Sequence, residues 1–320
     1  MEASNLQFKK VVESFLKESS RNLFSAYGLR MSKKISTADF RVDGSTKISL
    51  ADFPNTIDPV YDGKSDYKKQ LREARETLDD LQRMMYAHDR HGLLCVFQAM
   101  DAAGKDGTIR NVFSGVNPHG VAVHSFKRPS EEEIDHEFLW RSQDHLPQRG
   151  HVSIFNRSYY EEVLVVKVHP EIATKYQRLP VESLDDIWTG RYASIRDHEA
   201  HLARNGTRVL KFFLNLGKDE QRDRFVARID ESEKNWKFNE GDVKERGFWD
   251  DYQRAYEDAI NETSTPDAPW FVIPANDKKN MRLIVSQIIR EELESLDMSY
   301  PEVSEERRGE LAVFRENLLK

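Results

Sequence analysis

Short apolar runs alternate with longer amphipathic stretches through most of this chain. The apolar runs have the length and the flanking turn residues of buried strands, and they occupy residues 93–97, 121–126, 151–155, 207–216 and 270–273. The stretches between them carry apolar residues at helical spacing, which predicts helices over residues 68–91, 108–113, 131–145, 195–203, 218–233, 249–262 and 281–296, and from about Tyr159. Strands that alternate with such helices predict an α/β fold with a parallel sheet covered on both faces.

The two ends of the chain depart from this alternation. Residues 1 to about 35 carry apolar residues at helical spacing and predict a helix, whereas residues 36–63 contain scattered Pro, Gly, Asp and Ser and predict an extended arm. The charged C-terminal residues predict a peripheral helix. We therefore divide the chain into an N-terminal helix and arm (1–63), a main α/β domain (64–300) and a C-terminal peripheral helix (301–320).

Composition limits the class of protein. The apolar runs are too short to span a membrane, and the first ten residues, MEASNLQFKK, lack the apolar core of a secretory signal. The single cysteine, Cys95, lies in an apolar run, so neither a disulfide within the chain nor a cysteine metal cluster is expected. The formal net charge of −7 disfavours a nucleic-acid-binding protein, although local basic clusters can still bind a polyanion. We expect a cytoplasmic protein with no membrane or nucleic-acid partner.

The segment from Leu93 to Ile109, LLCVFQAMDAAGKDGTI, points to phosphate binding. It predicts a buried strand, a turn of small residues and the start of a helix, which is the arrangement of a P-loop. Backbone N–H groups of the turn, the helix N-terminus and the ammonium group of Lys105 can all hold phosphate oxygens. The candidate phosphate ligands are Ala102, Ala103, Gly104, Lys105, Asp106, Gly107 and Thr108. The alternative is a tight strand–helix turn with a solvated lysine.

This loop departs from the usual pattern G-x-x-x-x-G-K-[ST] in ways that bear on its ligand. Ala99 takes the place of the first glycine, Asp106 takes that of the Ser or Thr, and Asp101 adds an acid inside the loop. A carboxylate there repels phosphate unless a cation lies between them, so we expect Asp101 to bind Mg²⁺. The alternative role for Asp101 is that of an acid in an Asx-turn.

A second polar cluster follows the predicted strand 151–155. Because the carboxyl ends of parallel strands meet at one sheet edge, we expect Asn156 and Arg157 beside the P-loop. Asn156 can bind a metal through its carbonyl oxygen, and Arg157 can stabilise charge on a transferred phosphoryl group. Glu161 is a candidate for orienting metal-bound water or a substrate. The alternative is that Glu161 and Glu162 are ordinary acids at a helix N-terminus.

Basic residues concentrate in two further places. Residues 217–238 combine inward-facing apolar positions with cations, which fits a lid over about residues 217–248 that neutralises a phosphate chain. The cations proposed for this lid are Lys218, Arg222, Arg224 and Arg228. Acids are mixed with them, so a solvated helix is the alternative. Lys127 and Arg128 end a predicted strand and are candidate phosphate contacts.

Taken in order, these segments resemble the blocks of the family 2 polyphosphate kinases. The matching blocks include QAMDAAGKDGTIRNVF, FNRSYYEEVLVVKVHPE, FFLNLGKDEQRDRFVARID, FWDDYQRAYEDAI and APWFVIPANDK. The resemblance extends over roughly residues 36–292 and implies a P-loop kinase-like three-layer α/β/α fold with a helical lid, similar to that of the thymidylate kinases. It also implies that Asp101 binds metal and that Lys105 binds phosphate. Many members have Asp at the position of Asn156, so the second metal ligand stays open.

The family resemblance implies a function as well. Members transfer phosphoryl groups reversibly between inorganic polyphosphate and nucleotides with Mg²⁺, for which Mn²⁺ is the alternative cofactor, and NRSYYEE resembles the subgroup that acts on both AMP and ADP. The expected partners are polyphosphate, AMP, ADP and ATP, and the expected assembly is a homo-oligomer (dimer or tetramer). Two other functions stay open on the residues alone: an ATP-dependent nucleotide or small-molecule kinase, and a non-catalytic nucleotide- or polyphosphate-binding module.

Overall fold

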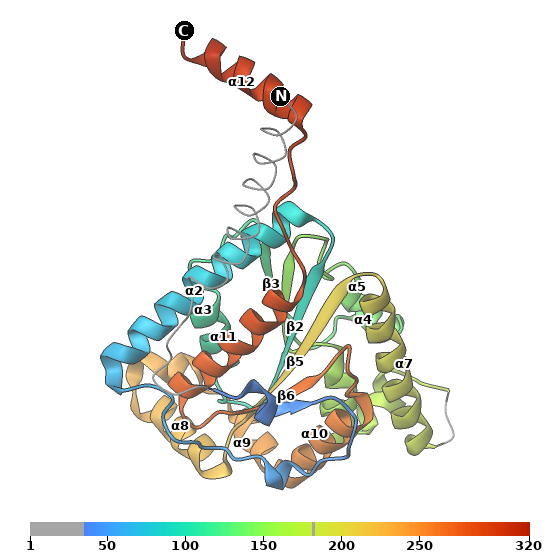
Figure 1. Ribbon diagram of the computed structural model, residues 1–320. Coiled ribbons are helices and arrows are strands. Elements are labelled where there is room, and N and C mark those ends of the chain that lie inside the picture. Colours follow the sequence, from blue (N-terminus) through green and yellow to red (C-terminus); the bar gives the residue numbers. More distant parts are fainter. Residues whose placement is uncertain (1–34, 181–182) are drawn as a thin grey trace.

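A six-stranded sheet lies at the centre of the computed structural model, which describes residues 35–180 and 183–320 (Figure 1). Its strands are β1 (Arg41–Val42), β2 (Gly92–Gln98), β3 (Val121–Ser125), β4 (Val152–Asn156), β5 (Thr207–Asn215) and β6 (Trp270–Pro274). In space they follow the order β1-β6-β5-β2-β4-β3, and every neighbouring pair is parallel except β1 with β6. The predicted parallel sheet is confirmed, with a short antiparallel strand added at its edge by the predicted arm.

Helices cover both faces of this sheet. One face carries α2 (Gly63–His88), α3 (Lys105–Val112) and α11 (Lys278–Ser295), and the other carries α7 (Leu184–Arg204) and α10 (Trp249–Thr263) (Figure 1). The central strand β2 is buried throughout, because alternate side chains enter the two cores. Leu93, Cys95 and Phe97 lie in the core with α2 and α11, and Leu94 and Val96 lie in the core with α7 and α10. The predicted three-layer α/β/α fold is confirmed.

The helix predicted over residues 131–145 is divided in two. It begins as expected, because Ser130 and Glu133 form a capping box at the start of α4 (Glu131–Asp135). His136 then takes an extended conformation (φ −102°, ψ 167°), which ends the helix, and α5 (Trp140–Gln143) follows as a separate turn. The spacing of apolar residues over 131–145 therefore did not reveal that the helix is interrupted at His136.

The segment after β4 is also less regular than predicted. In place of one helix from about Tyr159 it forms the 3-10 helix η3 (Tyr159–Val163), the single turn α6 (Val165–Val168) and the π-helical turn η4 (Ile172–Tyr176). The helix predicted over 195–203 is the second half of α7, which begins after its N-cap Ser183. Irregular backbone thus lies next to β4, where the candidate site residues are.

The predicted lid region contains three elements. Helix α8 (Lys218–Asp230) follows β5, and η5 (Ser232–Lys237) and α9 (Glu240–Arg246) come after it. In Figure 1, α8 and α9 lie together at one end of the sheet. The predicted helix over 218–233 is therefore confirmed for most of its length, and it ends three residues early because Glu231 is extended (φ −95°, ψ 107°).

The N-terminal arm runs beside β6 and is held by side chains of the main body. It includes η1 (Thr37–Phe40) and η2 (Leu50–Asp52). The Leu50 N–H donates to the Glu257 carboxylate at 2.7 Å, and the Ile48 N–H donates to the Asn261 side chain at 2.8 Å. Both acceptors lie on α10, so the arm is fixed to the helix that covers this side of the sheet.

The chain ends in α12 (Glu305–Leu318), which is exposed along its whole length and projects away from the body of the protein (Figure 1). The helix predicted before residue 35 lies outside the described residues. The division into three parts at residues 63 and 300 stays a prediction. Among the residues whose placement is given, no helix is both long and apolar enough to cross a membrane.

Candidate active site

The turn between β2 and α3 contains two residues with a left-handed backbone. Gly104 has φ +101°, which glycine adopts without penalty, and Ala102 has φ +64°, a left-handed conformation that costs an alanine about 1–2 kcal/mol. The Lys105 ammonium group folds back and donates to the Ala99 carbonyl oxygen at 2.9 Å. Ala99 itself is buried in the core, so its methyl group fits where the usual motif has glycine.

A cavity of about 730 Å³ opens in front of this turn, at the carboxyl ends of the parallel strands. It brings together most of the predicted site. The predicted residues that line it are Asp101, Ala102, Ala103, Gly104, Lys105, Asp106, Gly107, Lys127, Arg128, Asn156, Arg157, Arg224 and Arg228. Residues far apart in the sequence therefore form one strongly cationic surface, and the predicted position of Asn156 and Arg157 beside the P-loop agrees with it.

Four predicted residues do not line this cavity, and one of them, Glu161, lines a smaller cavity beside it. Thr108 is fully buried, and its hydroxyl donates to the Gly104 carbonyl oxygen at 3.0 Å, so it stabilises the start of α3. The Lys218 ammonium group lies 5.9 Å from the centre of the Trp249 ring. Arg222 is exposed and pairs with the neighbouring acids of its own helix. The sequence pattern does not distinguish these cations from those that face the cavity.

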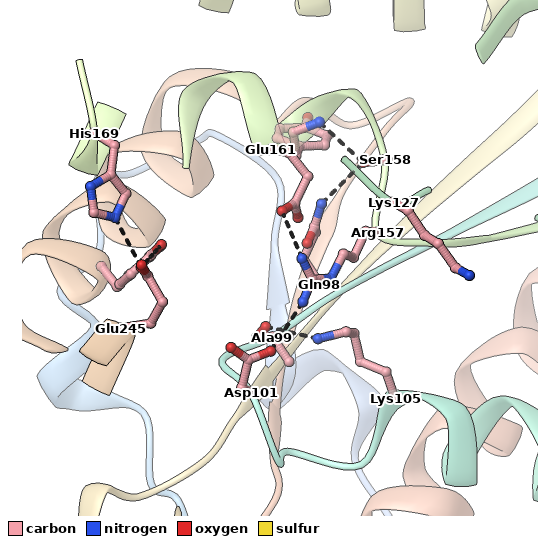
Figure 2. A network of polar contacts seen from close by, with 12 residues as sticks. Gln98, Ala99, Asp101, Lys105, Lys127, Arg157, Ser158, Glu161, His169 and Glu245 are labelled. Atoms are coloured by element: carbon pink, nitrogen blue, oxygen red, sulfur yellow. Dashed lines mark hydrogen bonds and ion pairs between the residues drawn. The ribbon is translucent and has the colours of Figure 1, made fainter. Parts of the chain in front are cut away.

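Arg157 lies between two carboxylates at the centre of the site. Its guanidinium group is 3.0 Å from the Asp101 carboxylate and 3.5 Å from that of Glu161. In Figure 2 the side chains of Asp101, Lys105 and Arg157 converge, whereas Lys127 points away from them. Arg157 has φ +62°, and its N–H donates to the Phe97 carbonyl oxygen at 3.0 Å, which holds this left-handed residue against β2.

The charges in this group shift one another's pKa values. The carboxylate of Glu161, followed by that of Asp101, raises the pKa of Arg157. Burial raises the pKa of Glu161, against the opposing effect of Arg157. Burial, with the positive charge of Arg157, lowers the pKa of Lys105. Lys105 therefore holds its proton less firmly than a free lysine does. An anion bound next to it would raise its pKa again.

Two carboxylates and one amide oxygen in the cavity suit a magnesium ion. Asp101 and Asp106 line the wall, and the Asn156 side-chain amide donates to Asp106 at 2.7 Å, which leaves its own carbonyl oxygen available. No group of three or more His, Cys, Asp or Glu that could hold a metal is found in residues 35–180 and 183–320. Mg²⁺ is commonly held by one or two carboxylates together with substrate phosphates and water, so these residues fit an ion that arrives with a phosphate chain.

The guanidinium group of Arg224 is hydrogen-bonded mainly to backbone carbonyl oxygens of the loops around it. Its Nε donates to Glu220 at 2.7 Å, and its two terminal nitrogens donate to the carbonyl oxygens of Ala102, Ala103, Ala275 and Asn276. All five N–H hydrogens of the guanidinium group are thus used within the chain. Arg224 therefore links α8 to the P-loop and to the loop after β6.

Other contacts hold α8 and α9, the region predicted to be a lid, to neighbouring elements. Arg228 of α8 pairs with Asp242 of α9 at 3.2 Å. Farther along α9, the Glu245 carboxylate accepts a bond from the Tyr252 hydroxyl at 2.6 Å and lies 2.9 Å from a ring nitrogen of His169 (Figure 2). These contacts tie α9 to α8, α10 and the irregular segment after β4.

The cavity also contains cations that sequence reasoning left out of the site. Lys234 follows α8, and Lys278 and Arg282 lie one turn apart at the start of α11. A signal for the last two exists, since α11 follows the carboxyl end of β6, which is a parallel strand of the same sheet. Their spacing of four residues places both on one face of the helix.

A smaller cavity of about 310 Å³ adjoins the first. The two share Phe126, Lys127, Arg128 and Arg157 in their walls, and Glu161 lines the smaller one. The rest of its lining is largely apolar and includes Ile134, Val165, Val166, Ile172 and Tyr176. A large charged cavity therefore shares a wall with a smaller, largely apolar one.

Comparison with known proteins gives consistent matches. The family model described as Polyphosphate kinase 2 (PPK2) matches residues 61–301. The chain is 55% identical over 288 residues to an ADP-polyphosphate phosphotransferase of Rhodopseudomonas palustris (90% of this chain, 100% of the relative). It is 46% identical over 264 residues to an AMP/ADP-polyphosphate phosphotransferase of Meiothermus ruber (82% and 95%). A crystal structure of polyphosphate kinase 2 from Arthrobacter aurescens TC1 is similar at TM-score 0.79 and 37% identity, covering 88% of this chain and 97% of that one.

Proposed function

Because this chain belongs to the polyphosphate kinase 2 family, we propose that it transfers the terminal phosphoryl group of inorganic polyphosphate reversibly to AMP or ADP, giving ADP or ATP. It is a phosphotransferase. The observation that carries the proposal is the large cationic cavity, whose lining contains more basic residues than one phosphate needs and which adjoins a compact apolar cavity. One ligand of the pair is thus a phosphate chain, and the other has an apolar part.

In this proposal the protein aligns the two substrates and offsets their charge, which is most of what phosphoryl transfer requires. The N–H groups of the P-loop turn and Lys105 hold the reacting end of the donor. Arg157, fixed between Asp101 and Glu161, lies where charge accumulates on the transferred group. Its left-handed backbone is fixed by the bond to Phe97, so the guanidinium group is in place before substrate arrives.

We assign magnesium binding to Asp101 and Asn156, with Asp106 beside them as a third donor. When bound, Mg²⁺ supplies positive charge to the phosphate oxygens. Mn²⁺ also prefers oxygen donors and is expected to substitute. The neutral amide of Asn156 is a weaker donor than a carboxylate, and the Asp106 carboxylate held by it compensates for the missing negative charge.

The smaller cavity is our candidate site for the nucleoside of the acceptor. Its apolar wall suits a base, and Lys127 and Arg128 at the shared wall suit the acceptor phosphates. Glu161 faces this cavity and is joined to Arg157, so it is placed to orient the acceptor end of the reaction. We expect AMP and ADP to enter from this side and polyphosphate from the other.

The remaining parts of the proposal concern the setting of the reaction. AMP, ADP and ATP are cytoplasmic metabolites, which supports a cytoplasmic location. We also propose a homo-oligomer, either a dimer or a tetramer. Light scattering on the purified protein tests this, since a mass of one chain, 37.3 kDa, would contradict it.

The function is tested by offering one phosphate donor at a time. The protein is incubated with Mg²⁺ and either AMP or ADP, with polyphosphate or ATP as the only donor, and the products are resolved by chromatography. We expect ADP or ATP to form with polyphosphate, and no product from a Lys105→Gln control. Turnover with ATP alone would indicate an ATP-dependent kinase. Tight binding of polyphosphate without turnover would indicate a binding module.

A further inference from the structure

Gln98, the last residue of β2, is polar where the pattern of its strand calls for an apolar side chain. Alternate residues of a strand point to the same face of the sheet, and Leu94 and Val96, which precede Gln98 on this face, lie in the core with α7 and α10. Gln98 is as completely buried as they are. Within the described part of the chain its Oε1 has no hydrogen-bond partner, which costs free energy, so core stability does not explain a glutamine here.

The amide nitrogen of Gln98 holds the start of η3. Nε2 donates to the Ser158 hydroxyl at 3.2 Å (Figure 2), and this hydroxyl also accepts a bond from the Tyr160 N–H at 3.1 Å. The residue before Gln98 makes a similar link, because the Phe97 carbonyl oxygen accepts the Arg157 N–H. Two consecutive residues of β2 therefore fix the two consecutive residues that precede η3.

The same side chain also contacts the carboxylate of Glu161. Burial raises the pKa of Glu161, whereas the charges of Arg157 and Lys105 and a hydrogen bond from the Gln98 side chain lower it. The hydrogens of a glutamine side-chain amide are on Nε2, so Nε2 is the donor of this bond as well. Both of its hydrogens are thus used, one by Ser158 and one by Glu161, and this sets the orientation that leaves Oε1 without a donor.

We propose that Gln98 is a positioning residue, which ties the Glu161 carboxylate and the start of η3 to the end of β2 and so keeps Glu161 in place for phosphoryl transfer. This inference rests on the proposed function, in which Glu161 orients the acceptor. Glu161 also contacts Arg157, but that guanidinium group pairs with Asp101 as well. When substrate phosphates compete for Arg157, the bond from Gln98 still holds the carboxylate.

The test replaces Gln98 by Met, which is similar in size and has no hydrogen-bond donor. Steady-state kcat and KM are measured for AMP, ADP and polyphosphate, each with the other substrate and Mg²⁺ saturating. We expect kcat to fall about tenfold, the effect of losing one hydrogen bond to a charged group, because Glu161 is no longer held in its productive position. KM for polyphosphate should stay within about twofold, since the donor contacts are untouched. Gln98→Leu, which removes the same bond with a different shape, should behave alike.

The pH profile separates this role from general damage to the fold. The charged and titratable groups that interact with Glu161 are Arg157, Lys105, Asp101 and, on α10, Tyr252 and Tyr256. All of them are kept in Gln98→Met, while the bond that lowers the pKa of Glu161 is lost, so this pKa rises. The carboxylate then takes up its proton at a higher pH, and the acidic limb of kcat should move to higher pH than in the unmodified protein.

The matched control is Gln82→Met on α2. Gln82 is also buried, its Nε2 donates to the Gly150 carbonyl oxygen at 3.3 Å, and its Oε1 likewise has no partner among the described residues. It lines neither cavity. Its replacement should lower the melting temperature and leave kcat, both KM values and the pH profile unchanged.

A double variant decides whether Gln98 acts through Glu161. In a Glu161→Gln background, Gln98→Met should change kcat by no more than about twofold, because the carboxylate that it positions is already gone. An effect of the same size in both backgrounds would overturn the inference, as would a normal kcat with an unmoved acidic limb in Gln98→Met alone. If the unmodified protein transfers no phosphoryl group from polyphosphate to AMP or ADP, the proposed function itself is wrong.

Discussion

Two residues that line the site, Ala102 and Arg157, have a left-handed backbone, and neither is glycine. Such conformations persist where surrounding contacts hold them, and here Arg224 binds the Ala102 carbonyl oxygen while the Phe97 carbonyl oxygen accepts the Arg157 N–H. Both residues are thereby held in place before any ligand binds. Preorganised charge of this kind is the main means by which a protein accelerates phosphoryl transfer.

Replacing Asp101 by Asn tests the metal assignment. The carboxylate is expected to hold Mg²⁺ and it also fixes Arg157, so kcat should fall by about 10²-fold or more even at saturating Mg²⁺. Affinity for Mn²⁺ in the presence of polyphosphate, measured by electron paramagnetic resonance, should fall as well. Asp219→Asn is the control, since this acid of α8 does not line the cavity. Normal turnover together with normal Mn²⁺ affinity would remove Asp101 from the metal site.

The pH dependence of donor use should report Lys105. Its pKa is lowered from the ordinary value of 10.5, so the free enzyme loses this positive charge at a lower pH than a free lysine would. We expect kcat/KM for polyphosphate to decline on the alkaline side beginning below pH 10.5. In Lys105→Arg, which keeps its proton, the decline should move to higher pH. A decline at the same pH in both proteins would assign it to another group.

At the scale of elements, the sequence predicted best those strands and turns that are determined by their own residues rather than by contacts with distant segments. The apolar runs gave five of the strands nearly to the residue, and the P-loop turn was recognised from its small residues and lysine. The two-residue strand β1 was missed because it is too short to carry an apolar run, and the break at His136 was missed because no Gly or Pro marks it. The 3-10 helix after β4 was missed because buried contacts with distant elements hold it there.

One such contact is the buried ion pair between Glu199 of α7 and Lys211 of β5. Its nitrogen and oxygen are 2.6 Å apart, and both side chains are almost wholly inaccessible to solvent. The other oxygen of Glu199 accepts bonds from the hydroxyls of Tyr159 and Tyr160, at 2.9 Å and 2.8 Å. The pair therefore anchors η3, the element that follows Arg157 and carries Glu161.

Breaking this pair should be costly when only one of the two partners is replaced. Glu199→Gln keeps an acceptor for the tyrosines but leaves the Lys211 charge unpaired, and it should lower the free energy of unfolding by about 3–5 kcal/mol. Lys211→Met should cost a similar amount. The double variant should lose much less than the sum of the two, because it buries no lone charge. Urea denaturation measures all three, and additive losses would show that the pair is not the source of the effect.

At the scale of the whole molecule, the site is assembled from segments spread over most of the chain. The sequence indicated the P-loop and the cluster after β4 because each has its own motif, and the parallel sheet placed them together. It did not separate Arg228, which lines the cavity, from Arg222, which pairs with acids on the exposed side of the same helix. Lys278 ends the block APWFVIPANDK, but neither it nor Arg282 has a local pattern that indicates phosphate binding, and only the position of β6 in the sheet brings them to the P-loop.

The central claim is that phosphate moves from an inorganic chain to a nucleotide in this cavity, and ³¹P nuclear magnetic resonance follows both compounds at once. The protein is incubated with AMP, Mg²⁺ and polyphosphate, with no other nucleotide present. The account predicts that the β-phosphate signal of ADP grows in step with the loss of polyphosphate, without a matching rise in orthophosphate, and that Lys105→Gln abolishes this change. Unchanged AMP, or loss of polyphosphate only to orthophosphate, would contradict it.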